Sequence, residues 1–271
     1  MRQVIRIGVL LAAVAAVGAG GRFTPTITAA PVIVLVELFT SEGCSSCPPA
    51  DALLRRLFAD QPISGVTIVG LGSHVDYWDR LGWRDPFSSA QSSQRQSSYG
   101  TAVFSSDRIY TPQIVVDGSF ESVGSNEAAI RRNILRSAQQ PKAAVEIAAT
   151  LQTAQSARID VRVALPDSVK RSGAADLVVA LTEDGLVSQV RRGENGGRTL
   201  MHSAVVRLMR TIAHVGATDR ATSATAVMKL GQGWNAGNLR VVAFVQEQSS
   251  RRVLGVGAAM PPGAAEAGRH E

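Results

Sequence analysis

The first 140 positions carry apolar residues in two different patterns. Val32–Phe39 (VIVLVELF) is an almost continuous apolar run rich in β-branched residues, which is typical of a strand buried on both faces. Gly65–Val75 (GVTIVGLGSHV) predicts a second buried strand. Between them, PPADALLRRLFAD predicts a helix, because Pro48–Pro49 fit a first turn and apolar residues recur on one helical face at Leu53, Leu54, Leu57 and Phe58.

The pattern continues with two further strands and two further helices. Ser88–Val103 is polar but helical in character, and Tyr110–Val116 predicts a third strand. Asp117–Gly118 is a turn signal that pairs this strand with Ser119–Val123. Ser125–Gln139 predicts a helix with a serine N-cap. The predicted order is therefore β-α-β-α-β-β-α, ending near residue 140.

From Pro141 onward the chain reads as short strands separated by turn residues. Such a series, without a convincing helix, predicts an all-β, sandwich-like domain. The alternative for one segment, residues 203–212, is a helix. The predicted strands are Ala143–Leu151, Arg158–Leu165, Leu177–Leu181, Val187–Val190, Val205–Val215, Thr222–Leu230, Leu239–Val245 and Val253–Ala258.

The N-terminus MRQVIRIGVLLAAVAAVGAG has the features of an export signal. Arg2 and Arg6 precede the uncharged apolar run Ile7–Gly20, and small residues follow it. The run is shorter than the roughly 18–20 residues that cross a bilayer. We therefore expect a periplasmic or secreted protein that meets the membrane only through this segment, and only if the segment stays uncleaved.

Net charge argues against nucleic acid as a partner. The formal charge is +6, and removal of Arg2, Arg6 and Arg22 with the signal lowers it to +3. The remaining basic pairs are scattered and lack interleaved aromatic residues, whereas a nucleic-acid surface needs them on one face.

The two cysteines of the chain, Cys44 and Cys47, lie three residues apart between the first strand and the first helix. A disulfide that closes so small a ring contributes only about 2 kcal/mol, which argues against a purely structural purpose. Residues at this spacing share one helical face and can form a disulfide. Unpaired amides and the helix dipole would favour a Cys44 thiolate as the attacking group, with Cys47 resolving the mixed disulfide.

The segment VELFTSEGCSSCPPAD resembles the active-site turn of the thioredoxin superfamily. The resemblance implies a thioredoxin-like α/β domain in which Pro112 is cis, faces the cysteines and shapes the substrate groove, with Thr111 beside it. Together with HVDYWDRLGW, YTPQIVVDG and GRTLMHSAVVR, the segment resembles a family of exported bacterial thioredoxin-like proteins without an assigned function. That likeness spans about residues 33–260.

The predicted organisation has four parts. Residues 1–30 form the export signal, 31–140 an α/β thioredoxin-like N-terminal domain, 141–260 an all-β, sandwich-like C-terminal domain, and 261–271 a disordered tail. The predicted function is a thiol–disulfide oxidoreductase with Cys44, Cys47 and Pro112 as its site. Its partners would be protein thiols or disulfides and a redox partner, without an organic cofactor.

Neighbouring residues divide into supporting and structural candidates. Glu37, His74 and Asp76 could support proton transfer, whereas Glu42 is expected to face solvent and Asp85 to cap a turn. His202 is expected to be an ordinary strand residue. Arg191–Leu200 (RRGENGGRTL) is an unusual loop, either an anion-binding or interdomain surface or a flexible connection.

Two alternatives remain open at this point. A binding or structural protein would carry the same pair as an inert disulfide. A copper-binding protein would use the two thiolates with His74, although no residue is assigned as a metal ligand here. The sequence predicts no oligomeric state.

Overall fold

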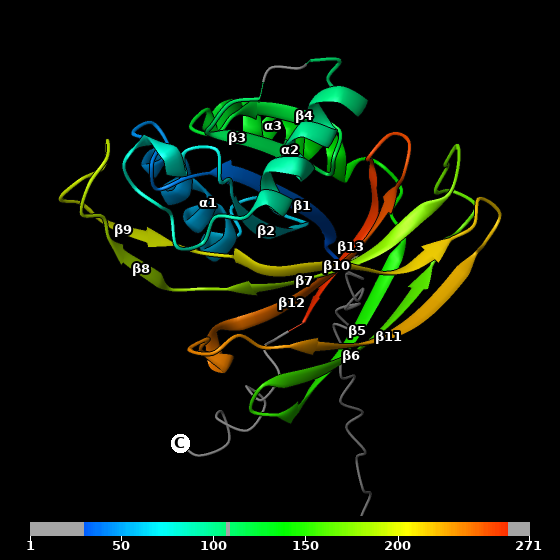
Figure 1. Ribbon diagram of the computed structural model, residues 1–271. Coiled ribbons are helices and arrows are strands. Elements are labelled where there is room, and N and C mark those ends of the chain that lie inside the picture. The colour runs from blue at the N-terminus through cyan, green and yellow to red at the C-terminus, as the bar shows by residue number, and fades with distance from the viewer. Residues whose placement is uncertain (1–29, 107–108, 260–271) are drawn as a thin grey trace, which may run out of the picture. The chain divides into compact units, whose positions relative to one another are not determined.

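The computed structural model describes residues 30–106 and 109–259 (Figure 1). From Pro31 onward the described residues form one compact unit. The predicted tail at 261–271 and, apart from Ala30, the predicted export signal lie outside the described residues. Among the helices of the described part, none is long and apolar enough to cross a membrane.

The first half of the unit has the predicted order of elements. Its third helix begins after Asn126, whose side chain accepts a hydrogen bond from the Ala129 amide, so Asn126 rather than Ser125 is the N-cap. A 3-10 turn lies at Asp79–Leu81. The elements are β1 (Val32–Thr40), α1 (Pro48–Asp60), β2 (Val66–His74), α2 (Ala90–Ala102), β3 (Gln113–Val116), β4 (Phe120–Val123) and α3 (Glu127–Ala138).

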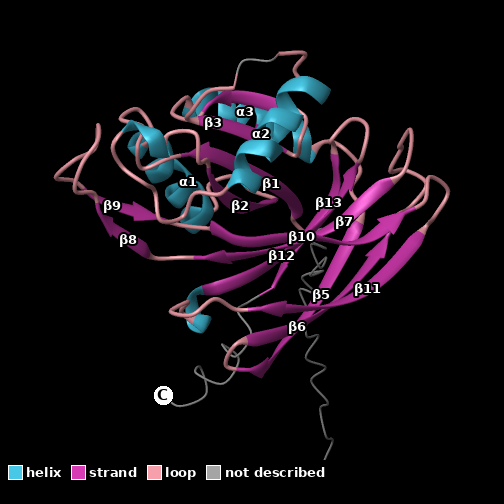
Figure 2. Cartoon of the chain, in the orientation of Figure 1, coloured by secondary structure: helices cyan, strands magenta, loops and turns pink. Residues whose placement is uncertain are grey.

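In the second half, the described residues form strands and one 3-10 turn at Ala236–Asn238 (Figure 2). Eight of the strands match the predicted ones, β9 was not predicted, and the ambiguous segment 203–212 is extended. The strands are β5 (Ala144–Thr153), β6 (Ser156–Ala164), β7 (Ala175–Glu183), β8 (Leu186–Gln189), β9 (Thr199–His202), β10 (Val205–Val215), β11 (Ala221–Lys229), β12 (Leu239–Glu247) and β13 (Val253–Ala259).

Strands from both halves join in one mixed sheet of eight, in the order β13-β12-β7-β10-β2-β1-β3-β4. Within it β1 is parallel to β2 and antiparallel to β3, and β10 continues the sheet beyond β2. The prediction of an α/β thioredoxin-like N-terminal domain followed by an all-β, sandwich-like C-terminal domain is therefore wrong. The protein is mostly β, and its principal sheet is shared by the two halves.

The two halves join where β2 lacks side chains. Gly72 donates its amide to the Ala204 carbonyl oxygen at 2.7 Å, and a Cβ on Gly72 would lie 3.2 Å from the Ser203 carbonyl oxygen. A Cβ on Gly70 would lie 3.3 Å from the Ala204 Cβ. Glycines inside a strand allow such close approach of another backbone. Gly70 and Gly72 of the second predicted strand therefore allow β10 to pair along the edge of β2.

Each face of the large sheet has its own cover. On one face Val34, Val36 and Leu38 pack against α1 and α3. Farther along the chain, alternate residues of β7 and β12 pack against the three-stranded sheet β11-β6-β5. On the other face Phe39 packs with Tyr99 of α2. Figure 1 shows the helices gathered around β1–β4 and away from β5, β6 and β11.

Candidate functional site

The two cysteines form a disulfide in the turn before α1. Cys47 is the N-cap residue of α1, and its Cα lies 5.4 Å from that of Cys44. Both cysteines are buried, with 1% and 0% of their surface exposed, whereas Ser45 and Ser46 between them are exposed. The Ser46 Oγ lies 3.3 Å from the Cys44 Sγ. The predicted proximity of the two thiols is confirmed.

The start of α1 differs from the expectation in one respect. Its first two positions are Pro48 and Pro49, which have no amide hydrogen to offer. The next two amides, of Ala50 and Asp51, donate to the Cys47 carbonyl oxygen. The helix therefore does not present unpaired first-turn amides to the Cys44 sulfur, and its dipole is the part of the expected stabilisation that remains.

A loop from the second half of the chain covers the disulfide turn. Arg191–Arg198, which we call the cap loop, joins β8 to β9. The side-chain amide of Asn195 is fully buried and donates to the carbonyl oxygens of Glu42 at 2.8 Å and Cys44 at 2.9 Å. The Glu194 carboxylate accepts a hydrogen bond from the Ser45 amide at 2.9 Å. The loop is therefore held against the backbone of the cysteine turn by three hydrogen bonds.

We expect Asn195→Ala to speed reduction of the disulfide by dithiothreitol about tenfold. Two buried hydrogen bonds that hold the cap loop are lost, and each contributes about 0.5–1.5 kcal/mol to the closed state. The rate would be followed by gel shift after alkylation. Asn235→Ala, which removes a turn hydrogen bond to Gly237, is the control and leaves the rate unchanged. Equal rates in both variants would show that the cap loop does not limit access.

Beneath the cap loop lies a buried carboxylate that the sequence did not predict. Glu42 was expected to face solvent, yet it is fully buried. Its Oε2 accepts a hydrogen bond from the Trp83 indole at 2.7 Å, and its Oε1 lies 3.1 Å from the His202 Nε2. Burial lowers the pKa of His202, but the carboxylates of Asp51 and Glu42 outweigh it and raise the pKa to about 9. His202, expected to be an ordinary strand residue, is thus tied to the cysteine turn.

A second buried histidine–carboxylate pair adjoins the first. The His74 Nδ1 lies 2.7 Å from the Asp85 Oδ2, and both side chains are almost fully buried. Burial raises the pKa of Asp85, but the charge and hydrogen bond of His74 lower it below its usual value. The rings of His74 and His202 meet edge to face, with centroids 4.8 Å apart, and Phe87 packs on both. Asp85 therefore does more than cap a turn.

Trp78 connects the proline turn to the cysteine turn. The Thr111–Pro112 peptide bond is cis, as the resemblance implies. The Thr111 Oγ1 accepts a hydrogen bond from the Trp78 indole at 2.8 Å, and Trp78 packs against Gly43, next to Cys44. Thr111, which precedes Pro112, is thus connected to the cysteine turn through Trp78.

Gly124 is the point where Pro112 meets α1. A Cβ at this position would lie 2.8 Å from the Pro112 Cβ and 2.9 Å from the Ala50 Cβ. We expect Gly124→Ala to lower the free energy of unfolding by about 1–3 kcal/mol through overpacking. Urea denaturation measures this effect. Gly173→Ala, with open space around the added methyl, is the matched control, and an equal small effect in both would contradict the prediction.

The other predicted supporting residues lie elsewhere. Glu37 points to the face of β1 opposite α1, where it accepts hydrogen bonds from Ser73, Arg95 and Tyr99. The Asp76 Oδ1 accepts a hydrogen bond from the Ser93 Oγ at 2.5 Å at the start of α2. Neither carboxylate has a hydrogen bond to the cysteines among the described residues.

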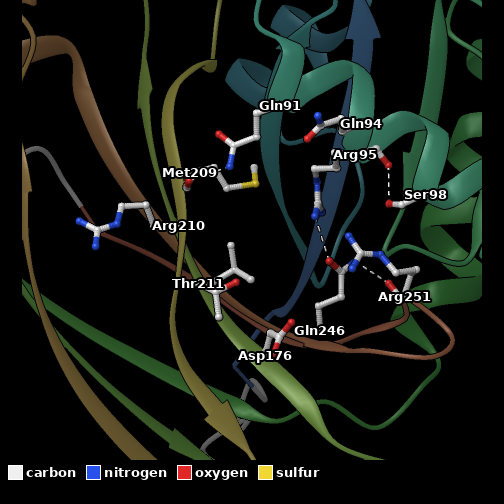
Figure 3. Close-up of a pocket in the computed structure, with 11 residues that line it drawn as sticks. Gln91, Gln94, Arg95, Ser98, Asp176, Met209, Arg210, Thr211, Gln246 and Arg251 are labelled. Carbon is white, nitrogen blue, oxygen red and sulfur yellow. Dashed lines mark hydrogen bonds between the residues drawn. The ribbon is translucent and has the colours of Figure 1, made fainter.

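A cavity of about 280 Å³ opens beside Arg95, between α2 and strands β7, β10 and β12 (Figure 3). Arg95 does not point free into it, because its Nη1 donates to Gln246 at 2.9 Å and its Nη2 to Tyr99 at 2.7 Å. Gln246 in turn donates to the Arg251 carbonyl oxygen. This cavity lies away from the cysteine turn and adds no residue to it.

Comparisons with known proteins show the fold and the family. A protein of Agrobacterium tumefaciens, AGR_C_4864, has a similar crystal structure, with a TM-score of 0.63, 23% identity, and coverage of 86% of this chain and 96% of that one. HBP35 of Porphyromonas gingivalis also has a TM-score of 0.63, with 15% identity and coverage of 87% and 78%. Identities this low show the fold alone, and no curated protein matches the sequence.

The family model described as "Protein of unknown function (DUF1223)" matches residues 35–246. The match begins within β1 and ends in β12, and so includes the disulfide, both histidine–carboxylate pairs and the cap loop. The chain belongs to the DUF1223 family.

Proposed function

We propose that the protein is a thiol–disulfide oxidoreductase that uses the Cys44–Cys47 pair. The observation that carries the proposal is this disulfide, formed between residues three apart at the start of α1. The turn is enclosed by residues far apart in the sequence, namely Trp78, Thr111 and Asn195. A disulfide of so small a ring adds little stability, whereas the surrounding residues hold it in one geometry.

The exchange reaction transfers two electrons. A substrate thiolate attacks the Cys44 sulfur, the Cys44–Cys47 bond breaks, and Cys47 leaves as a thiolate that takes up a proton. The second thiol of the substrate then attacks the mixed disulfide, which releases the substrate disulfide and leaves Cys44 reduced. Cys44 is the proposed point of attack because it lies in the turn before α1, whereas Cys47 is the N-cap residue of that helix.

Both cysteines are buried, and the cap loop is hydrogen-bonded to their turn, so movement of this loop is the proposed route of access. The partners we propose are protein thiols or disulfides and a second protein that restores the oxidation state of the pair. Export to the periplasm or beyond, which the apolar N-terminal run favours, would place the pair where disulfides persist. Cell fractionation tests this location.

The proposal is tested by trapping and by alkylation. In reduced full-length protein, iodoacetamide is expected to modify Cys44 well below pH 8 while Cys47 stays protected, as read by mass spectrometry. Cys47→Ser is expected to accumulate a mixed disulfide with one half of a disulfide-linked peptide dimer, because the Cys44 thiolate attacks the peptide disulfide and the other half leaves as a thiol. Cys44→Ser forms none. Ser46→Ala is the control that keeps both thiols. Equal, slow alkylation of both cysteines and no mixed disulfide would contradict the proposal.

A further inference from the structure

We propose that His74, His202 and Asp51 form a binding site for a divalent transition-metal ion of the zinc type, independent of the two thiols. One ligand atom from each of the three residues lies within 4.8 Å of the other two. The residues come from the end of β2, the end of β9 and the first turns of α1. The proposal does not depend on the redox function.

Each histidine already has the support that a metal-bound imidazole needs. The His74 Nδ1 is held by the Asp85 carboxylate at 2.7 Å, which leaves Nε2 for a ligand. The His202 Nε2 is held by the Glu42 carboxylate at 3.1 Å, which leaves Nδ1. Metal-binding histidines almost always have a carboxylate, carbonyl or water on the other ring nitrogen, because it fixes the ring and raises its basicity.

The free nitrogen of His202 is the observation that points to a missing ligand. Its side chain is 2% exposed, and Nδ1 has no hydrogen-bond partner among the described residues. The nearest acidic oxygen, Asp51 Oδ1, lies 3.9 Å away, too far for a hydrogen bond. A buried unpaired polar atom costs about 1–3 kcal/mol, and a metal ion between this nitrogen and Asp51 would remove that cost.

The donor set selects the class of ion. Two imidazole nitrogens and one carboxylate oxygen suit zinc and its neighbours, whereas calcium and magnesium prefer oxygen ligands alone. Bonds of about 2.0–2.2 Å place tetrahedral ligand atoms roughly 3.4 Å apart. Side-chain rotations that bring the present separations, which reach up to 4.8 Å, down to this value complete such a site.

The three residues have an apolar neighbour on one side and a cavity on another. Phe87 packs against the rings of His74 and His202. On another side a cavity of about 160 Å³ reaches Asp51 and His202 between α1 and β9. An ion entering there would keep one coordination position for water or an outside ligand, as zinc sites with three protein ligands do.

Zinc titration of the oxidised full-length protein tests the site, because the disulfide then withholds the thiols. After treatment with a chelator, calorimetry is expected to show one zinc per chain. Asp51→Asn and His202→Gln are each expected to weaken zinc binding about 100-fold or more, since loss of a ligand costs at least as much as loss of its support. The control is His214→Ala, at an exposed histidine paired with Asp176, and it is expected to leave the zinc affinity unchanged. Calcium is not expected to compete with zinc for the site.

Asp51→Asn keeps the size of the side chain, and circular dichroism checks its fold. If a variant does not fold, NMR of the wild-type histidine rings decides, because zinc is expected to shift His74 and His202 but not His214. Absence of zinc binding, unchanged affinity in folded Asp51→Asn, or shifts confined to other histidines would overturn the proposal. Loss of zinc binding in a Cys44→Ser/Cys47→Ser protein would also overturn it, because the thiols would then be needed.

Discussion

Arg95→Met is expected to lower the free energy of unfolding by about 3–5 kcal/mol. The Arg95 Nε donates to both carboxylate oxygens of Glu37, at 2.8 and 3.0 Å. The side chains are only 8% and 1% exposed. Methionine fills much of the space that the Arg95 side chain occupies, but it leaves the Glu37 carboxylate between β1 and α2 without its ion-pair partner. Breaking a buried ion pair is costly because it leaves such an uncompensated charge.

Removal of both the Glu37 and the Arg95 charge is expected to recover most of the lost free energy of unfolding. Replacing a whole buried ion pair by apolar residues is often neutral or stabilising, so the Glu37→Met/Arg95→Met protein should exceed Arg95→Met in stability. Urea denaturation measures all variants. Arg131→Met is the control, because the side chains of its i,i+4 pair with Glu127 are 37% and 38% exposed, and loss of such a surface pair costs under about 1 kcal/mol. An Arg95→Met protein within that same 1 kcal/mol would contradict this account of the buried pair.

The metal-free protein is expected to lose about 3 kcal/mol of stability between pH 6.5 and pH 9 through His202. The pKa of this ring is raised from its ordinary 6.5 to about 9 by Asp51 and Glu42, against the effect of burial. Between these values the folded protein holds a proton that the unfolded chain has released. The contribution of His202 to the free energy of unfolding is therefore fully present below pH 6.5 and is lost as the pH rises toward 9.

Urea denaturation at a series of pH values, with a chelator present, measures this dependence. His202→Gln removes the titrating ring and is expected to flatten the decline above pH 6.5. His214→Ala is the matched control, because its ring is 76% exposed, and it should retain the wild-type decline. The same slope in wild type and His202→Gln would show that another group carries the pH dependence.

Local structure could be predicted from the sequence, but its assembly could not. Val32–Phe39 and the helical face of PPADALLRRLFAD predicted β1 and α1 because period and composition are local signals. The pairing of β10 with β2 depends on Val205 meeting Gly72, which are far apart in the chain. Gly70 and Gly72 were the available signal, since glycine within a strand marks close backbone approach.

The candidate site shows the same division. The disulfide could be predicted because Cys44 and Cys47 are neighbours in sequence. Glu42, Asn195 and His202 were missed because their roles arise only when the cap loop folds back onto the cysteine turn. Nothing near Glu42 in the sequence distinguishes a buried carboxylate from an exposed one, and the partner that matters lies 160 residues away.

The reduction potential of the Cys44–Cys47 pair tests the central claim most directly. The full-length protein would be equilibrated in glutathione buffers of graded composition, and the fraction of disulfide read by alkylation and mass spectrometry. An exchange protein is expected to have a potential between about −120 and −270 mV, the range of known thiol–disulfide oxidoreductases. A potential well below about −300 mV would contradict the claim, because the disulfide would then be a structural bond that exchange partners do not reduce.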